Sequence, residues 1–213
     1  MSIQMDMRVT HLLCSRMCHD LISPASAVKT GVEFIQDTGS GMEADALSLL
    51  ENSAGQLNAK LTFFRSAFGR GGEADNLSRV RELVQGLAGG GKVSLDWPME
   101  AGDLALGRDA ARLLLNLLFL AFDTVQVSGI LTVRLANLSE GIGVAIAMEG
   151  RGVRIRDDLT EAMEPGVSIE SLTPRSVQAY FVCRLTEDMG TTIEVSQPEP
   201  DRVEIASLLP TMG

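Results

Sequence analysis

Two long amphipathic segments open the chain, and a short glycine-containing turn separates them. In residues 5–37 apolar side chains recur every three or four positions, and residues 43–68 repeat this pattern. On a helix such spacing places the apolar side chains in one stripe. The run Asp37-Thr38-Gly39-Ser40-Gly41 between them has the composition of a turn. The pattern therefore predicts an antiparallel helical hairpin.

A single hairpin leaves much of its apolar stripe uncovered, because two helices enclose little core between them. Four helices enclose more, so we expect this segment to form a homodimer with a four-helix bundle. The alternative is that the hairpin packs against the rest of its own chain. The expected stripe consists of Leu13, Met17, Leu21, Val28, Val32 and Ile35 in the first helix, and Leu47, Leu50, Ala54, Leu57, Leu61, Phe64 and Phe68 in the second.

The pattern changes after Gly69-Arg70-Gly71-Gly72, which we interpret as a linker. Short apolar runs then mix with helical segments, which predicts a two-layer α/β sandwich and an α+β chain with domains 1–72 and 73–213. The expected helices lie near 77–88, 108–125 and 174–188, and the expected strands lie near 92–96, 103–106, 130–137, 142–148, 191–196 and 202–208.

Composition excludes several classes of protein. The 213 residues are 45% hydrophobic and carry a net charge of −10, so the chain has a globular composition and lacks the basic surface that nucleic acid requires. No apolar stretch is long enough to span a bilayer, the N-terminus lacks signal-peptide features, and three cysteines do not suggest a disulfide framework. We expect a cytoplasmic protein with neither a nucleic-acid nor a membrane partner.

The chain contains only two histidines, His11 and His19, so any histidine chemistry must use one of them. On a helical wheel His19 lies on the face opposite the apolar stripe and should face solvent. An exposed histidine often has no role. Here, however, Asp20 follows it directly and Pro24 lies five residues further on, inside the same expected helix. Proline in a helix removes a hydrogen bond and costs several kcal/mol, so Pro24 requires an explanation.

The segment His19-Asp20-Leu21-Ile22-Ser23-Pro24 resembles the phosphoacceptor box of sensor histidine kinases, whose usual form is His-Glu-Leu-Arg-Thr-Pro. In that family the box lies on the first helix of a dimeric hairpin. The resemblance implies that His19 accepts a phosphoryl group while Asp20 holds the other ring nitrogen. The residues on the same face, which we expect to contact a receiver domain, are Ser15, Arg16, Ile22, Ser23 and Ser26.

The second half of the chain resembles the ATP-binding domain of these kinases only in outline. The apolar segment 113–121 is similar to the N box, and Asn116 matches its first asparagine. The second asparagine of the box, a Mg²⁺ ligand in the family, is Leu120 here, and a basic residue that often follows is Asp123. The resemblance therefore implies that one metal ligand has been lost.

Two further nucleotide-binding elements depart from the kinase pattern. Gly150 and Gly152 match the glycine box, but its adenine-binding aspartate falls on Met148, and Glu149 is one position away. The segment 173–176 replaces a glycine-rich phosphate loop and contains a proline, which removes an N–H donor. With three elements altered together, ATP binding is not expected.

A phosphoacceptor hairpin followed by a degenerate kinase-type domain is similar to the ChpT-type histidine phosphotransferases of alphaproteobacterial phosphorelays. That resemblance implies relay of a phosphoryl group through His19 between aspartates of receiver domains, on a hybrid kinase and on response regulators. No cofactor would be bound by this chain, and the receiver would supply Mg²⁺. The alternatives are an ATP-dependent sensor-type histidine kinase and a non-enzymatic dimeric adaptor that binds receiver domains.

Three other patterns have simpler interpretations. Residues 86–92 fit most of a phosphate-binding loop, but the final hydroxyl is missing and a helix precedes the segment, so we interpret it as a glycine connection. His11, Cys14 and Cys18 share a helical face that could hold a metal, although thiols at such spacing are more often small core residues. A basic patch, either a solvated loop or a receiver contact, contains Arg151, Arg154 and Arg156.

Overall fold

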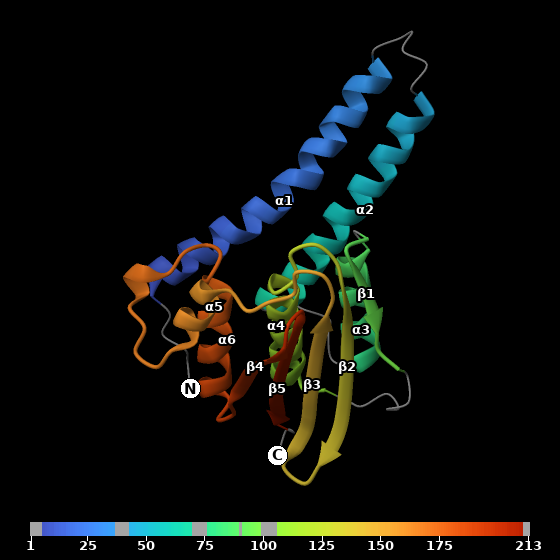
Figure 1. The fold of residues 1–213 in the computed structure, drawn as a ribbon. Helices are drawn as coiled ribbons and strands as arrows, with labels where there is room; N and C mark the ends of the chain where they lie inside the picture. Colours follow the sequence, from blue (N-terminus) through green and yellow to red (C-terminus); the bar gives the residue numbers. More distant parts are fainter. Residues whose placement is uncertain (1–5, 37–42, 70–75, 90, 99–105, 211–213) are drawn as a thin grey trace.

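The computed structural model describes residues 6–36, 43–69, 76–89, 91–98 and 106–210. Helices α1 (Met7–Gln36) and α2 (Glu43–Phe68) form the predicted hairpin, which projects from a mixed α/β body (Figure 1). The expected turn at 37–41 and residues 70–72 of the expected linker lie outside the described residues. The hairpin prediction is therefore confirmed in its two helices.

The body is a five-stranded sheet with helices on one face, which confirms the predicted α+β sandwich (Figure 1). The strand order is β1-β2-β3-β5-β4, with β1 parallel to β2 and the other neighbours antiparallel. Helix α4 crosses the covered face, with α3 and α6 beside it. The body elements are α3 (Leu77–Ala88), β1 (Val93–Asp96), α4 (Arg108–Asp123), β2 (Gly129–Leu138), β3 (Gly141–Glu149), α5 (Asp157–Met163), a 3-10 turn (Ile169–Ser171), α6 (Val177–Asp188), β4 (Ile193–Glu199) and β5 (Arg202–Pro210).

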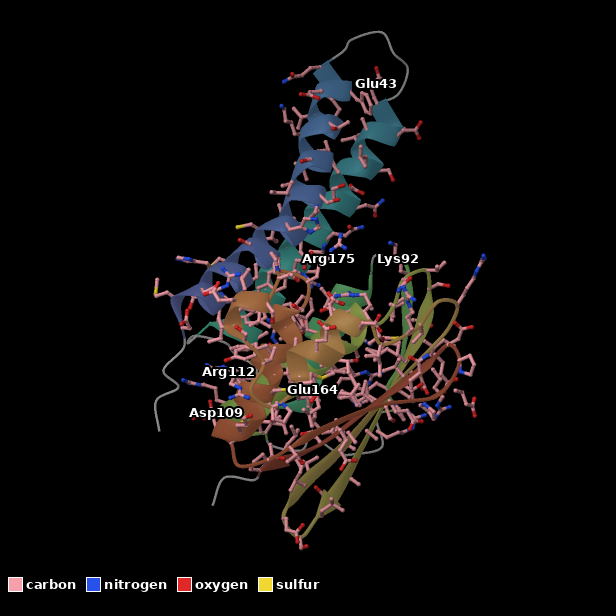
Figure 2. The ribbon with its side chains drawn as sticks, turned by 60° about the vertical axis from the view of Figure 1, so that its left-hand side comes forward. Glu43, Lys92, Asp109, Arg112, Glu164 and Arg175 are labelled. Atoms are coloured by element: carbon pink, nitrogen blue, oxygen red, sulfur yellow. The ribbon has the colours of Figure 1, made fainter. Side chains whose placement is uncertain are left out.

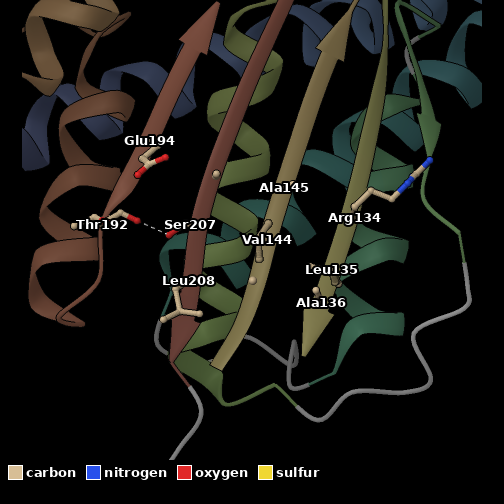
Figure 3. A pocket seen from close by; sticks show the side chains of 11 residues that line it. Arg134, Leu135, Ala136, Val144, Ala145, Thr192, Glu194, Ser207 and Leu208 are labelled. Carbon is tan, nitrogen blue, oxygen red and sulfur yellow. Dashed lines mark hydrogen bonds between the residues drawn. The ribbon is translucent and has the colours of Figure 1, made fainter. Parts of the chain in front are cut away.

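Strand β3 shows how the sheet separates its two faces. Val144, Ile146 and Met148 alternate along the strand and are buried under the helices. The opposite face carries small side chains such as Ala145, and there the sheet forms an open hollow of about 490 Å³ (Figure 3). The hydroxyl of Ser207, which lines this hollow, donates to the carbonyl oxygen of Thr192 at 2.8 Å. The hollow therefore faces away from α4 and from the hairpin.

The base of the hairpin belongs to the same hydrophobic core as the body. Phe63 and Phe64 of α2 are buried against Phe119 of α4, with ring centroids 5.5 and 5.6 Å from it. Phe68 lies 6.2 Å from Phe119 and 5.5 Å from Phe181 of α6. Such aromatic pairs contribute about 0.5–1.5 kcal/mol each beyond the area they bury. This packing fixes the lower hairpin relative to α4.

Three details of the body differ from the sequence prediction. The segment after β3 contains α5, which we expected to be a loop; Asp157 and Asp158 in its first turn favour helix formation there. Helix α6 begins at Val177 instead of residue 174. The strand expected at 103–106 falls mostly outside the described residues, and Leu106 is not in a strand.

None of the described helices combines the length and apolar character that a bilayer crossing requires.

Candidate functional site

His19 lies in the middle of α1 with its side chain 86% exposed, as its position on the helical wheel predicted. Its Nδ1 atom lies 3.4 Å from Oδ1 of Asp20. Among the described residues no group bonds to the other ring nitrogen, Nε2. In the tautomer that carries its proton on Nδ1, this geometry directs the proton towards Asp20 and leaves Nε2 unprotonated and exposed to solvent.

Asp20 is itself held by the preceding turn of α1. The Nε atom of Arg16 donates to Oδ2 of Asp20 at 2.9 Å. The two carboxylate oxygens thus have different partners, Arg16 for Oδ2 and His19 for Oδ1. The side chain of Asp20 is only 20% exposed, although it is next to the exposed imidazole.

Arg16 also binds Asp123 at the end of α4. Its two terminal nitrogens donate to the two carboxylate oxygens of Asp123, at 2.5 and 3.3 Å, and its guanidinium lies 5.3 Å from the ring centre of Phe119. Burial alone would lower the pKa of Arg16, but the carboxylates of Asp123 and Asp20 raise it above its ordinary value. Burial raises the pKa of Asp123, with Arg16 acting in the opposite direction. The ion pair connects the phosphoacceptor-like helix to the body.

Pro24 explains a second contact to Asp20. Proline has no N–H, so the carbonyl of Asp20, four residues earlier, has no donor within the helix. The Nζ atom of Lys60 on α2 donates to this carbonyl at 2.8 Å. A cation from the neighbouring helix therefore offsets the hydrogen bond that Pro24 removes, one residue away from His19.

Four of the five residues expected to contact a receiver domain are exposed on α1: Ser15, Ile22, Ser23 and Ser26. Ile22 is 62% exposed. Arg16 differs, because its side chain is only 16% exposed and both of its carboxylate partners belong to this chain. The structure thus directs this side chain towards two carboxylates of its own chain, and its contact with a receiver domain stays a prediction.

A cavity of about 600 Å³ opens beside Asp20, between the hairpin and the body. Its polar lining includes Arg16, Asp20, Ser23 and Lys60, and Phe64 contributes to its apolar part. Lys92, at the edge of the body nearest the hairpin, also lines it, whereas Glu43 marks the far end of the hairpin (Figure 2). The sequence analysis did not identify Lys60 or Asp123 as members of this site. The sequence does indicate that a residue such as Lys60 is needed, because Pro24 leaves the Asp20 carbonyl without an N–H donor in its own helix.

Asn116, which matches the first asparagine of the kinase N box, connects helices in the core of this protein. Asn116 is fully buried, and its Nδ2 donates to the carbonyls of Ala67 and Arg112, both at 2.9 Å. Its Oδ1 accepts from Gln178 of α6 at 3.1 Å. Leu120, at the position where the resemblance to the kinases places a Mg²⁺ ligand, is 2% exposed within the core. All polar atoms of this asparagine side chain therefore hold helices together.

Gly150 and Gly152, which match the glycine box, have roles in the backbone geometry of this segment. Gly150 has a φ of +149°, and a Cβ atom there would lie 2.3 Å from a backbone carbonyl oxygen. The N–H of Gly152 donates to the carboxylate of Asp201 at 2.9 Å. Met148 is buried in the core, and Glu149 points to the exposed side of β3. Glu149 is therefore not on the buried face of β3 that Met148 occupies.

Arg156 is not part of a free basic patch. It donates to both carboxylate oxygens of Asp158, at 2.8 and 3.0 Å, and to the carbonyl of Arg175 at 3.1 Å. The hydrogen bond from Arg156 lowers the pKa of Asp158. Only Arg151 and Arg154 of the expected patch are exposed. Arg156 instead connects α5 to the segment that replaces the phosphate loop.

The possible metal cluster of His11, Cys14 and Cys18 does not form. All three side chains are exposed, and the part of the chain that the structure describes contains no group of three potential ligands suited to a metal. The two thiols are therefore not core residues either. Cys183 is buried, and burial raises the pKa of its thiol to about 11.

The chain is similar in sequence and in fold to known phosphotransferases. Residues 77–201 match the family model of the histidine phosphotransferase C-terminal domain. The chain is similar to the protein phosphotransferase ChpT of Brucella abortus (strain 2308), with 30% identity over 195 residues, which cover 90% of this chain and 91% of the relative. It is also similar to a bacterial phosphotransferase of known structure, with a TM-score of 0.81 and 27% identity over 97% of this chain and 98% of the other.

Proposed function

Since this chain belongs to the ChpT-like histidine phosphotransferase family, we propose that His19 carries a phosphoryl group between aspartates of receiver domains. The observation that supports this assignment is an exposed imidazole whose Nδ1 faces a fixed carboxylate. The other histidine, His11, has no carboxylate partner among the described residues. His19 is therefore the residue of this chain best prepared to act as a phosphoacceptor.

The chemistry needs no proton transfer from the protein. The lone pair of Nε2 attacks phosphorus, a P–N bond forms, and the P–O bond of the aspartyl phosphate breaks, with its electron pair leaving on the aspartate oxygen. Nδ1 keeps its proton, so the imidazole becomes positively charged. Asp20, 3.4 Å from Nδ1, faces this developing charge and stabilises it. The return reaction, from His19 to a second receiver, follows the same steps in reverse.

The receiver domain would supply Mg²⁺ for this step. Close to His19 the described residues offer one carboxylate, Asp20, and Arg16 already occupies one of its oxygens. A divalent ion needs several oxygen ligands, and a receiver has an acidic pocket around its own aspartate. This chain would thus contribute the nucleophile, and its partner would contribute the metal.

We propose that the hairpin forms a homodimer through an exposed apolar face. Leu47, Ala54 and Leu61 are seven residues apart on α2 and are all exposed; Leu47 is 54% and Leu61 49% exposed. On α1, Val32 and Ile35 are also exposed. Such a face suits helix-to-helix packing in a four-helix bundle. Light scattering should give twice the chain mass, and a Leu47→Glu/Leu61→Glu variant should give the monomer.

We propose further that the body does not bind ATP. The N-box asparagine is engaged in the core, Leu120 occupies a ligand position, and Arg156 bonds to the segment that would form the phosphate loop. Calorimetry with Mg-ATP should show no heat of binding. Micromolar binding would favour the alternative of an ATP-dependent histidine kinase.

Phosphate uptake tests the function directly. The wild type, His19→Ala and His11→Ala are each incubated with a receiver domain phosphorylated on its aspartate. The wild type and His11→Ala should take up phosphate, and His19→Ala should not. His11 is a matched control because it is an exposed histidine on the same helix. Equal uptake by His19→Ala would overturn the proposal, and receiver binding without any phosphate uptake would indicate an adaptor.

A further inference from the structure

Asp20 is held at three of its atoms, which is unusual for a residue next to a solvent-exposed side chain. Lys60 binds its carbonyl oxygen, Arg16 binds Oδ2, and Oδ1 faces His19. Asp123 in turn fixes Arg16. We propose that Arg16, Lys60 and Asp123 are positioning residues for phosphotransfer, which set the Asp20 carboxylate against Nδ1 of His19. This inference rests on the proposed function.

The distance between Asp20 and His19 explains why positioning matters. At 3.4 Å the contact is near the upper limit of a hydrogen bond, so a small shift of the carboxylate would break it. A free aspartate on a helix surface samples several rotamers. The planar guanidinium of Arg16 restricts this freedom, because one side of the fork binds Asp20 and the other binds Asp123.

The anchor of this arrangement lies in the body. Asp123 is the last residue of α4, and its side chain is 7% exposed. Phe119, one turn earlier, lies against the Arg16 guanidinium. The end of the helix that resembles the kinase N box therefore binds the phosphoacceptor helix. This gives the degenerate body a direct part in phosphotransfer, in addition to stabilising the hairpin.

The chain offers a matched control in Arg8. This arginine is on the same helix and also binds the body, donating to the carbonyls of Ile169 at 3.0 Å and Glu170 at 2.9 Å. Among the described residues, Arg8 contacts neither Asp20 nor His19. Arg8→Gln therefore weakens the attachment of α1 to the body without removing a contact to Asp20.

The first experiment compares Arg16→Gln with Arg8→Gln in full-length protein. Transfer from a phosphorylated receiver is measured as kcat and KM, with wild type and His19→Ala alongside. We expect kcat to fall about tenfold or more for Arg16→Gln with KM changed less than about twofold, and Arg8→Gln to keep both near wild type. Equal losses in the two variants would overturn the positioning role. Uptake by His19→Ala would instead overturn the proposed function.

Nitrogen-15 NMR of the His19 ring gives a readout that overall stability does not affect. In the wild type the neutral ring should carry its proton on Nδ1, and in Arg16→Gln a larger fraction should carry it on Nε2. Lys60→Met should also increase the fraction of rings that carry the proton on Nε2. Lys60→Arg should keep the wild-type tautomer, because arginine retains a donor for the Asp20 carbonyl. An unchanged tautomer in both Arg16→Gln and Lys60→Met would contradict the inference.

A double variant separates positioning from folding. Replacing both partners of a buried ion pair with apolar residues often preserves stability, whereas removing one partner does not. We expect Arg16→Met/Asp123→Leu to melt closer to wild type than either single variant, yet to transfer phosphate about as slowly as Arg16→Gln. If the transfer rate recovers together with the melting temperature, the ion pair is only structural and the inference fails.

Discussion

The hairpin and the α/β body bury their residues to very different degrees. Four of the 30 residues of α1 are buried, whereas eleven of the 16 residues of α4 are. Each of these helices contains a segment that resembles a motif of the sensor histidine kinases. In α1 the motif residue His19 is exposed, and in α4 the motif residue Asn116 is enclosed in the core.

This difference bears on the two proposals that His19 accepts a phosphoryl group and that the body does not bind ATP. A phosphoacceptor needs only an exposed nucleophile and a fixed carboxylate, and both are present on α1. A nucleotide pocket needs polar side chains that face a cavity, and in α4 these positions have become apolar or structural. Substitutions in the body should therefore affect mainly folding, except at Asp123, which binds Arg16, and those in the hairpin should affect assembly and transfer.

The largest expected contrast is in cysteine reactivity. Cys14 on α1 is exposed, whereas Cys183 on α6 is buried with a pKa of about 11. At pH 8 about one Cys183 thiol in a thousand would be ionised even before burial limits access. We expect iodoacetamide to label Cys14 at least about a hundred times faster, as measured by mass spectrometry of peptides. Comparable rates at the two sites would mean that the core of the body opens readily.

The next largest contrast is the cost of removing one leucine. Leu117 of α4 is fully buried, and Leu117→Ala should lower the free energy of unfolding by about 2–5 kcal/mol. Leu61 of α2 is 49% exposed, and in a monomeric background Leu61→Ala should cost less than about 1 kcal/mol. Urea unfolding of both variants checks this comparison. A large cost for Leu61→Ala in the monomer would show that the exposed face packs within the chain.

A smaller effect is expected at the N-box position. Asn116→Leu removes the donor to the Ala67 carbonyl and the acceptor for Gln178, so it should cost about 1–3 kcal/mol of unfolding free energy. Adding Gln178→Leu should recover part of this loss, since both polar groups are then absent. Thermal melts with and without Mg-ATP provide the control. If ATP raised the melting temperature of the wild type but not of the variant, Asn116 would have a nucleotide role.

The smallest effect concerns the ion pair between Arg156 and Asp158. The pKa of Asp158 is lowered in the folded protein, so its ionised form stabilises the fold above the unfolded pKa and the benefit is lost as the pH falls. Because Asp158 is 38% exposed, Asp158→Asn should cost only about 0.5 kcal/mol at pH 7. The difference from wild type should shrink below about pH 4. A difference that persists at pH 3 would exclude this ion pair as its cause.

Much of the fold was predictable because hydrophobic periodicity determines it. The second helix of the hairpin was predicted at residues 43–68, where the structure has it, and β2 and β3 differ from prediction by a residue or so at each end. Helix α5 was missed because its seven residues are too few and too polar to show a period. The apolar stripe did not distinguish core residues from exposed ones. Leu47 and Leu61 are exposed, whereas Phe64 is in the core.

The site was only partly predictable. The exposure of His19 follows from its angle to the apolar stripe, and its neighbour Asp20 is adjacent in sequence. The ion pair of Arg16 with Asp123 joins residues 107 positions apart, and no local pattern indicates such a contact. Lys60 could have been sought, because the proline at position 24 leaves a carbonyl without a donor; which side chain supplies that donor depends on the register between α1 and α2.

The most direct test of the account is the chemical identification of the phosphorylated atom. The ¹⁵N-labelled protein is mixed with a phosphorylated receiver and Mg²⁺, and the product is examined by ³¹P and ¹⁵N NMR. We predict a single phosphoramidate on Nε2 of His19, with the proton retained on Nδ1 beside Asp20. Phosphate on Nδ1, on His11 or on a carboxylate of this chain would contradict the account.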